Sequence, residues 1–388
     1  MKNNIFSKRI VIFLFFIFIF LLLCWFIQYR KFFENMETID ADDADTGDTE
    51  AEEKDNEKDP KKNEAELREA YLETLTKHEK ERHFPYRYLY DENGKILPIV
   101  LVSGFFRDDK ERNIFTEYVY NGIKVVGITA YKSFPKPITD NTGDNSSKDD
   151  AFDYYENIKN WLCCFRDPDL FGFDKTHNLI DISESDFYDA DDKKEPVEKI
   201  YDVIYVCFKD DDECSTDGWN AVNRNYKLAT SCLPILINEF KLKVLIIGRL
   251  NCGLEKLYGD NIEILDFMPY FDFQEKLRQS RFLFMPNIYD ASPRVIAEAL
   301  IKDIPVLMNR TIICGAKYVN HETGELFTDE NDIRLSITRL LAREKSISPK
   351  KWWEKNYSKK KMAKKFRDFL YTQYPDILEK TKEVSFFM

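Results

Sequence analysis

The stretch Arg281–Asp332 decides the fold class of this chain: R-F-L-F-M-P-N-I-Y-D-A-S-P-R-V-I-A-E-A-L-I-K-D-I-P-V-L-M-N-R-T-I-I-C-G-A-K-Y-V-N-H-E-T-G-E-L-F-T-D-E-N-D. Short apolar runs alternate in it with an amphipathic segment. Phe282–Met285 predicts a strand, Pro293–Ile301 a helix and Pro305–Met308 the next strand. This succession is typical of a βαβ unit, whose two strands are parallel.

The predicted helix of this stretch carries groups suited to a sugar nucleotide. With Ser292 as N-cap and Pro293 as first helical residue, unpaired amides and the positive end of the helix dipole would face a diphosphate. The Arg294 guanidinium can bind phosphate through two hydrogen bonds. Asp290 and Glu298 form a D-x7-E pair, able to accept hydrogen bonds from sugar and ribose hydroxyls. By residue type alone, a turn aspartate and a solvated helix glutamate are favoured over this pair of binding groups.

The same alternation continues outward in both directions. The chain predicts strands at 96–102, 124–129, 179–182, 202–208, 243–247 and 262–265, and helices at 111–120, 154–165, 219–240 and 271–278. A charged, proline-containing segment at 190–196 separates the two halves. We therefore expect an α/β protein with two Rossmann-like, doubly wound domains that face a cleft.

The amino-terminal end of the chain predicts a membrane anchor. Ile10–Ile27 is an unbroken apolar run of eighteen residues, which spans about 27 Å as a helix, close to the thickness of the bilayer core. No small-residue cleavage site follows it, so an anchor is favoured over a cleaved signal peptide. Lys2, Lys8 and Arg9 precede the run, which favours a type II signal anchor with the body in an ER- or Golgi-like lumen.

Residues 28–95 read as an acidic stem followed by a short helix. Asp40–Asp59 holds eleven acidic residues against two lysines, and so accounts for most of the formal net charge of −12. Such a segment cannot bury enough surface to order itself, and it indicates a solvated spacer, or alternatively a docking tail. Because no basic stripe is visible elsewhere, we expect no nucleic-acid partner.

The eight cysteines and four histidines carry little chemistry in this pattern. No C-x-x-C pair is present and no histidine has the spacing of a metal ligand, so no metal site is expected. The irregular spacing of the cysteines does not indicate a disulfide framework either. We expect buried thiols that behave as small apolar residues.

Taken together, the motifs of the opening stretch closely resemble the carboxy-terminal domain of the retaining GT-B glycosyltransferases of family 4, also called group 1. The family has an E-x7-E pair, a small residue with Pro-Val, a glycine-containing loop and T-G-x-L-F. The matching features here are Asp290 with Glu298, Asp303–Val306, Cys314–Ala316 and Thr323–Phe327. The similarity covers about 180–345 well and 96–178 loosely.

The resemblance implies roles for individual residues. Glu298 would bind the nucleotide ribose and Asp290 would face the donor sugar, and the pair would form the catalytic centre. Near the donor phosphates and sugar it would place Ser292, Pro293, Arg294, Gly315 and Lys317. No metal or other cofactor is required in this family, and the nucleotide sugar is a substrate.

Two departures from the family pattern stand out. The first Glu of the pair is Asp290, which is shorter by one methylene. The loop Lys209–Gly218, which matches the position of the family's phosphate-binding Arg and Lys, is acidic. Lys209, Arg224 and Arg249 are the candidate replacements, and the sequence does not choose among them. On the acceptor side, Ser103 and Gly104 end the first predicted strand.

The predicted organisation is an N-terminal tail at 1–9, a transmembrane helix at 10–27, the stem and short helix at 28–95, a short acceptor domain at 96–190, a nucleotide-sugar-binding domain at 198–345, and a C-terminal helix at 346–388 that packs back across the cleft. A basic membrane-facing helix is the alternative for the last segment. The predicted function is glycan biosynthesis: transfer of a sugar to a glycan, lipid or protein acceptor at a membrane. The alternative is an inactive, transferase-like nucleotide-binding or scaffolding protein.

Three N-x-S/T sequons bear on topology: Asn145, Asn309 and Asn356. Asn309 follows a predicted core strand, where a glycan would be difficult to accommodate. That position slightly favours a cytoplasmic body, against the charge rule for the anchor.

Overall fold

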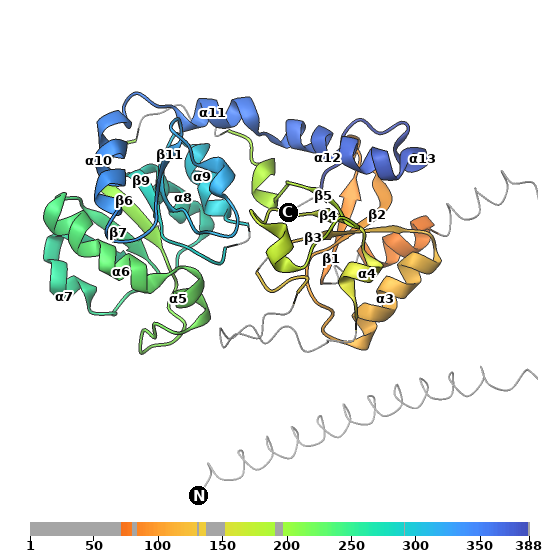
Figure 1. Ribbon diagram of the computed structural model, residues 1–388, viewed down its shortest axis with the longest axis horizontal. Helices are drawn as coiled ribbons and strands as arrows, with labels where there is room; N and C mark the ends of the chain where they lie inside the picture. Colours follow the sequence, from red (N-terminus) through yellow and green to blue (C-terminus); the bar gives the residue numbers. More distant parts are fainter. Residues whose placement is uncertain are drawn as a thin grey trace, which may run out of the picture. The chain divides into compact units, whose positions relative to one another are not determined.

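The structure, a computed structural model, describes residues 71–79, 84–129, 132–136, 152–190, 197–290 and 292–386 (Figure 1). All of them belong to one compact unit, Asp59–Met388. In this part of the chain no helix is both long and apolar enough to cross a membrane. The predicted anchor at 10–27, the stem at 28–70 and most of the linker at 190–196 lie outside the described residues.

The first sheet contains five strands in the order of the sequence. They are β1 (Tyr86–Tyr90), β2 (Ile96–Val102), β3 (Lys124–Ile128), β4 (Asn160–Leu162) and β5 (Asn178–Ile180). β1 is antiparallel to β2, and the other pairs are parallel. Residues 71–79 are helical and pack on this half through Leu75. Two further helices, α3 (Asp109–Tyr120) and α4 (Tyr154–Asn157), follow β2 and β3.

Two local predictions in this half are wrong. β1 lies inside the range 28–95 that the sequence assigned to the stem and a short helix, so the first sheet begins earlier than predicted. The helix predicted at 154–165 ends at Asn157, and β4 takes its place in the sheet. A three-residue strand is too short to show a period. The Trp161 ring in β4 occupies the space where a Cβ at Gly127 would lie, and backbone pairing with β3 and β5 identifies the strand.

The second sheet is fully parallel and doubly wound. Its strands are β6 (Tyr201–Val206), β7 (Val244–Ile247), β8 (Ile262–Leu265), β9 (Ser280–Met285), β10 (Val306–Asn309) and β11 (Gly324–Phe327). They lie in the order β11-β10-β9-β6-β7-β8. The strand order reverses between β6 and β9, and a ligand in such a sheet binds at the carboxyl ends of the strands beside this reversal.

The helices of the second half are α5 (Trp219–Asn223), α6 (Tyr226–Pro234), α7 (Leu254–Tyr258), α8 (Tyr270–Arg278), α9 (Arg294–Leu300) and α10 (Ile333–Arg343). The single helix predicted at 219–240 is wrong. Asn225 has φ of 49°, which ends α5, and a π-helical turn at Ile235–Glu239 follows Pro234. Buried residues on the predicted apolar face still enter the core, among them Ala229 and Leu233.

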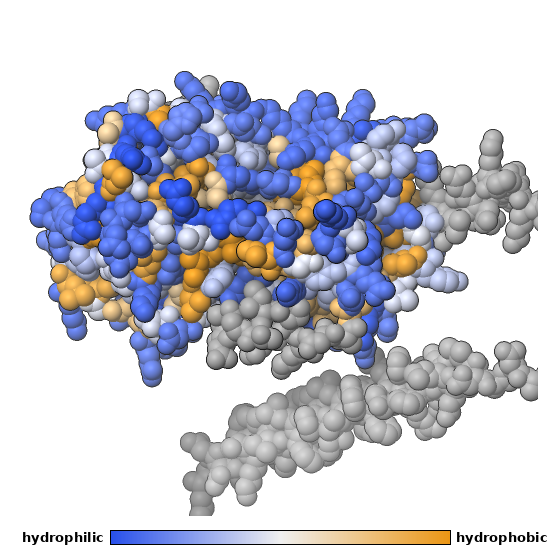
Figure 2. All heavy atoms as spheres, in the orientation of Figure 1, coloured by the Kyte–Doolittle hydropathy of each residue, from blue (hydrophilic) through white to orange (hydrophobic). Residues whose placement is uncertain are grey.

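The C-terminal segment packs on both halves through α11 (Pro349–Asn356), α12 (Lys359–Gln373) and α13 (Pro375–Leu378). Trp353 of α11 is fully buried in the cluster around α9, and its indole N–H donates to the Tyr188 carbonyl at 2.8 Å. Phe366 and Leu370 of α12 lie in the cluster that covers Ile99 of the first sheet. The surface above these helices is largely hydrophilic (Figure 2).

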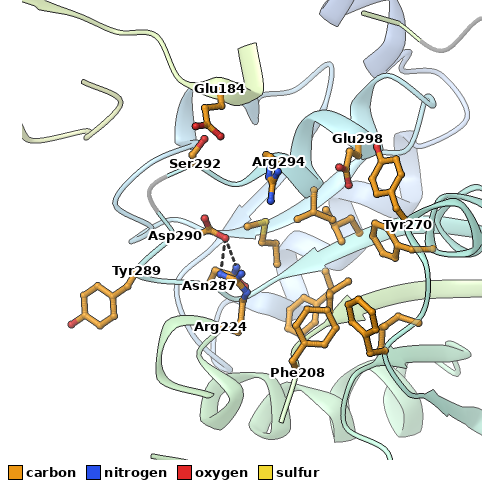
Figure 3. Close-up of a pocket in the computed structure, with 18 of the residues that line it drawn as sticks. Glu184, Phe208, Arg224, Tyr270, Asn287, Tyr289, Asp290, Ser292, Arg294 and Glu298 are labelled. Carbon is orange, nitrogen blue, oxygen red and sulfur yellow. Dashed lines mark hydrogen bonds and ion pairs between the residues drawn. The ribbon is translucent and has the colours of Figure 1, made fainter. Parts of the chain in front are cut away.

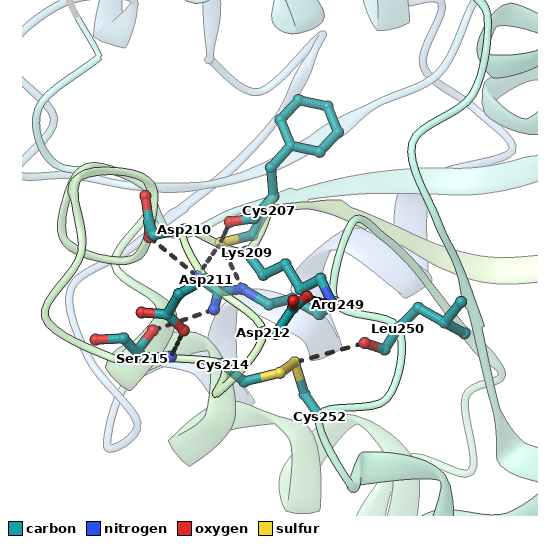
Figure 4. The surroundings of a disulfide bond; sticks show 11 residues. Cys207, Lys209, Asp210, Asp211, Asp212, Cys214, Ser215, Arg249, Leu250 and Cys252 are labelled. Atoms are coloured by element: carbon teal, nitrogen blue, oxygen red, sulfur yellow. Dashed lines mark hydrogen bonds and ion pairs between the residues drawn. A yellow bond between two sulfur atoms is a disulfide. The ribbon is translucent and has the colours of Figure 1, made fainter. Parts of the chain in front are cut away.

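The prediction that all the cysteines are thiols is wrong for one pair. Cys214, in the loop after β6, forms a disulfide with Cys252, in the loop after β7 (Figure 4). The two residues are 38 positions apart, and neither belongs to a recognisable cysteine motif. The other described cysteines are buried free thiols, at positions 163, 164, 207, 232 and 314.

Candidate active site

A pocket of about 620 Å³ opens at the carboxyl ends of the second sheet's central strands (Figure 3). Val206 of β6, Ile247 of β7 and Met285 of β9 line it. It therefore lies at the reversal of strand order between β6 and β9, where a doubly wound sheet binds ligands. Its volume is in the range of small-molecule sites.

Glu298 reaches this pocket from the second turn of α9 and is 5% exposed. The Tyr188 hydroxyl donates to its Oε1 at 3.3 Å. Burial raises the pKa of the Glu298 carboxyl, although Gln274, Lys302 and Arg294 act against that shift. Burial, and then the Glu298 carboxylate, also raise the pKa of Tyr270 to about 12. The Glu298 carboxylate is thus a buried hydrogen-bond acceptor with a fixed partner, rather than a solvated surface charge.

Asp290 lies in the same pocket and is already paired. Its Oδ2 accepts a hydrogen bond from the Arg224 guanidinium at 2.8 Å and another from Asn287 Nδ2 at 3.1 Å (Figure 3). Arg224 comes from the end of α5, and the side chains of Arg224 and Asp290 are 26% and 14% exposed. The structure therefore brings Arg224 into the pocket.

Two further arginines line the pocket. Arg294, the first residue of α9, is exposed, and no carboxylate of the described residues lies within ion-pair distance of it. Arg87 of β1 forms an ion pair with Glu184, which belongs to the 3₁₀ turn Glu184–Phe187 after β5. Glu184 and Ser292 both line the pocket (Figure 3). The first domain thus contributes a charged pair to the pocket.

The start of α9 differs from the prediction. Pro293, not Ser292, is the N-cap, and no side chain caps the helix, because the Ser292 carbonyl bonds the Arg294 amide at 2.8 Å instead. Ser292 lines the pocket, and its Oγ lies 3.4 Å from Ser185 Oγ. Gly315 has φ of 92°, and a Cβ there would be 2.7 Å from Pro293 Cγ. Pro293 and Gly315 therefore pack on each other and do not line the pocket.

Three predicted donor-binding cations lie outside the pocket. Lys317 binds Asp181 at 2.7 Å and Asp186 at 2.9 Å. Lys209 pairs with Asp212 at 2.9 Å. Arg249 is fully buried. Each of these side chains has an intramolecular partner, and none of them lines the pocket.

The acidic loop Lys209–Gly218 is folded onto its own domain. Asp210 accepts hydrogen bonds from the backbone amides of Asn220 (2.7 Å) and Ala221 (3.0 Å) at the start of α5. Arg249 donates to the Ser215 carbonyl at 3.2 Å (Figure 4). Its guanidinium lies 4.1 Å from the centre of the Tyr226 ring. The amides that would cap an anion at this helix are thus occupied by the chain's own carboxylate.

The predicted acceptor residues do not line the pocket. Ser103 is buried, and its hydroxyl donates to the Pro85 carbonyl at 3.0 Å, while Gly104 follows it in the buried segment after β2. The first domain reaches the pocket through Arg87, Glu184 and Tyr188 instead. The sequence missed these three residues. The S-E-S-D run at 183–186, which forms a capping box, was the available signal for Glu184.

Aromatic side chains form one wall and the rim of the pocket. Those on the rim are strongly exposed: Phe267 is 73% exposed, Tyr270 61% and Trp219 41%. Phe208 and Phe273 complete the group, and the Phe208 and Phe267 rings are 5.5 Å apart. Exposed aromatic faces beside a charged pocket can stack against a planar ring. Across the described part of the chain, no group of three side chains is arranged to hold a metal ion.

Comparison with known proteins gives structural matches alone. No protein-family profile and no curated protein sequence matches the chain. The TarM crystal structure is 13% identical over 66% of this chain and 52% of its own, with a TM-score of 0.46. The pneumococcal O-GlcNAc transferase GtfA, in complex with UDP and GlcNAc, is 11% identical over 70% and 55%, with a TM-score of 0.47. The chain spans about half the length of these two proteins.

A glycosyltransferase from Rickettsia africae ESF-5 matches 85% of this chain and 85% of its own, with 14% identity and a TM-score of 0.51. The fold is GT-B. The expectation of two α/β domains is therefore confirmed at the level of fold, but the prediction that both are doubly wound is wrong for the first, whose strands lie in sequence order without a reversal. Membership of family 4 stays a prediction.

Proposed function

We propose that this protein is a glycosyltransferase that moves a sugar from a nucleotide-sugar donor to a glycan, lipid or protein acceptor, with retention of the anomeric configuration. One observation carries the proposal. Asp290 and Glu298, spaced as D-x7-E, both line a pocket at the strand-order reversal of a GT-B fold, together with Arg224 and Arg294. The carboxylates of that pocket suit the hydroxyls of a nucleotide sugar, and its arginines suit the diphosphate.

In this proposal Glu298 accepts hydrogen bonds from the two vicinal hydroxyls of the nucleotide ribose. Its burial and its contact with Tyr188 hold the carboxylate in one position, so that little conformational entropy is lost on binding. The nucleobase lies against the aromatic rim that includes Phe208 and Trp219. The aromatic rim would thus bind the planar base, and Glu298 the polar ribose.

The diphosphate is bound by Arg294 and Arg224. Arg294 is available as it stands, whereas Arg224 is held by Asp290 in the unliganded protein. A diphosphate oxygen that takes the place of Asp290 on Arg224 would free the Asp290 carboxylate to accept hydrogen bonds from the donor sugar. Arg224 thereby replaces the phosphate-binding cations that the acidic loop Lys209–Gly218 lacks.

Transfer breaks the bond between the anomeric carbon and the donor phosphate oxygen and forms a bond between that carbon and an acceptor oxygen. The acceptor's hydroxyl proton leaves with the nucleoside diphosphate. The arginines stabilise the negative charge that develops on this leaving group, and no metal is required for that role. Arg87 and Glu184 offer a charged pair on the first-domain side, where an acceptor would approach.

We further propose that the apolar run Ile10–Ile27 tethers the enzyme and restricts it to acceptors at one membrane. Its length matches the bilayer core, and the acidic stem that follows would hold the body away from the lipid surface.

Saturation-transfer NMR with a panel of UDP-, GDP- and ADP-sugars tests the proposal. We expect one nucleotide to show saturation of its ribose and base protons and a donor of that nucleotide to be turned over. Glu298→Ala should abolish both signals, and Glu322→Ala, an exposed carboxylate away from the pocket, should change neither. Activity that survives in Glu298→Ala would show that the site is assigned incorrectly.

The second candidate is a transferase-like protein that binds nucleotides without turnover. The occupied amides of α5 and the Arg224–Asp290 pair favour it, because both reduce the free positive charge available to a diphosphate. Nucleotide binding with no release of nucleoside diphosphate, over the whole panel of sugars and acceptors, would support this candidate over the first.

A further inference from the structure

The disulfide between Cys214 and Cys252 carries information about where the protein folds. It joins two surface loops of the second domain, and both residues are partly exposed. The remaining described cysteines are buried, so they are protected from oxidants by the core. The one pair that lies within reach of solvent components is the pair that is oxidised.

Forming this bond removes two electrons and two protons from the two thiols and transfers them to an oxidant. Disulfides of this kind form and persist in secretory compartments, where thiol–disulfide oxidoreductases supply that oxidant. In a reducing cytosol, small thiols would have access to these partly exposed sulfur atoms. The excess of positive charge ahead of the predicted anchor also favours a body on the lumenal side.

A lumenal body makes the sequons accessible to glycosylation, and the structure separates the two that it describes. Asn309 is 1% exposed, its Nδ2 donates to the Pro286 carbonyl at 3.1 Å, and its Oδ1 accepts from Thr311. A glycan at this position would have no space. A lumenal body is therefore compatible with the buried Asn309, because this sequon would remain unglycosylated there.

Asn356 is placed very differently. It is the exposed last residue of α11, and its Nδ2 donates to the Trp352 carbonyl in its own helix at 2.8 Å. Tyr357 is extended, and Ser358 begins α12 as its N-cap. The sequon thus lies in the connection between α11 and α12, and its asparagine is exposed.

We propose that the body of this protein folds in the oxidising lumen of the secretory pathway and carries an N-linked glycan on Asn356. The co-substrate is a lipid-linked diphospho-oligosaccharide, and the oligosaccharide transferase of that compartment catalyses the transfer. A bond forms between Asn356 Nδ2 and the anomeric carbon, the carbon–phosphate oxygen bond breaks, and the lipid diphosphate leaves. One amide proton passes to a base of the transferase.

The test uses the full chain expressed in cultured eukaryotic cells, followed by digestion with peptide N-glycosidase and gel electrophoresis. Asn145 is removed from the comparison by the background substitution Asn145→Gln. In this background we expect one mobility shift on digestion. The shift should persist in Asn309→Gln and disappear in Asn356→Gln and in Ser358→Ala, whereas Ser358→Thr, which preserves both the sequon and the N-cap hydroxyl, should retain it.

No shift in the Asn145→Gln background, or a shift that persists in Asn356→Gln, would overturn the proposal. A second measurement is independent of glycosylation. Cells are lysed in a denaturant with a maleimide-coupled polymer, and the number of labelled thiols is counted on a gel. The wild-type chain and the Cys214→Ser/Cys252→Ser variant should carry the same number of labels. Two additional labels on the wild-type chain would mean reduced cysteines and a cytosolic body, which also overturns the proposal.

Discussion

Glu298 shows how the surroundings of one side chain decide its chemistry. On the surface of a helix it would be an ordinary solvated carboxylate. Here it is 5% exposed and lies beside the hydroxyl of Tyr188, and burial raises its pKa. The position lowers the stability of the charged form and holds its oxygens in place for a ligand. Asp290, in the turn before α9, is held in a comparable way by its ion pair with Arg224.

The raised pKa predicts how Glu298→Gln changes stability. When the pKa of a carboxyl is higher in the folded than in the unfolded protein, the free energy of unfolding falls as the pH rises from the unfolded-state pKa to the folded-state pKa. Below the unfolded pKa the wild type and the Gln variant should be equally stable. Above the folded pKa the variant should be the more stable protein, because it avoids burying a charge. Urea denaturation at a series of pH values measures this difference.

Glu322→Gln is the matched control, since Glu322 is exposed, and no growing difference with pH is expected for it. A Glu298→Gln variant that is less stable than wild type at neutral pH would contradict the prediction.

Arg224 should be the cation whose loss most weakens donor binding. A hydrogen bond to a charged group contributes about 1.5–3 kcal/mol, so Arg224→Gln is expected to raise the Kd of the nucleotide sugar about tenfold to a hundredfold. Titration calorimetry measures the change. Arg334→Gln removes an exposed arginine that pairs with Glu239 and should leave the Kd unchanged. Equal affinities for wild type and Arg224→Gln would move the phosphate site elsewhere in the pocket.

At the scale of elements, the acidic loop Lys209–Gly218 and α5 are held together by direct contacts. Asp210 accepts a hydrogen bond from a backbone amide at the start of α5, and Arg249 donates to the Ser215 carbonyl. The Cys214–Cys252 disulfide links this loop to the loop after β7. These contacts hold α5, and α5 presents Arg224 to the pocket. A loop whose composition suggests only solvated charge therefore has a positioning role.

Removal of the disulfide should cost stability that a reducing agent also removes. For a separation of 38 residues, the loss of chain entropy in the unfolded state corresponds to about 4 kcal/mol at most. We expect Cys214→Ser/Cys252→Ser to lower the free energy of unfolding by about 2–4 kcal/mol. Guanidinium denaturation without reductant measures the difference.

With a reducing agent present, the wild type and the double variant should denature at the same concentration. A difference that persists under reduction would mean that the serines, and not the missing bond, are responsible.

At the scale of the whole molecule, a buried polar cluster joins the two domains. Asp186 of the first domain is fully buried and accepts from Lys317 and from the Tyr318 hydroxyl of the second. Ser183 and Tyr318 share a further hydrogen bond of 2.9 Å. The pocket draws residues from both domains, so contacts that hold the domains together also determine the shape of the site.

Lys317→Met should destabilise the protein strongly, because it leaves the Asp186 carboxylate buried without its cation. Breaking a buried pair in this way costs about 3–5 kcal/mol. Calorimetric melting should show the loss, and Asp186→Asn combined with Lys317→Met should recover part of it, since the uncompensated charge is gone. Lys360→Ala, on the exposed side of α12, should stay within about 0.5 kcal/mol of wild type. A mild effect of Lys317→Met would argue against this pair as the domain contact.

The sequence by itself determined the α/β class, because the alternation of apolar runs is a local pattern that predicts parallel strands. It pointed to Asp290 and Glu298 only through the resemblance of the whole segment to family 4, and their roles stay predictions. The strand β4 and the break at Asn225 escaped it, since a three-residue strand and a single positive φ leave no periodic signal.

Only the tertiary structure decided which cation serves the pocket and which cysteines pair. Lys209, Arg224 and Arg249 are all cations in the sequence, and they differ in their surroundings. Lys209 pairs with an aspartate of its own loop, Arg224 lies in the pocket, and Arg249 is buried in the core. Arg87 and Glu184 are 97 positions apart in the chain and meet only through the first sheet. Contacts between distant segments depend on how whole elements pack, and no local pattern of the sequence encodes them.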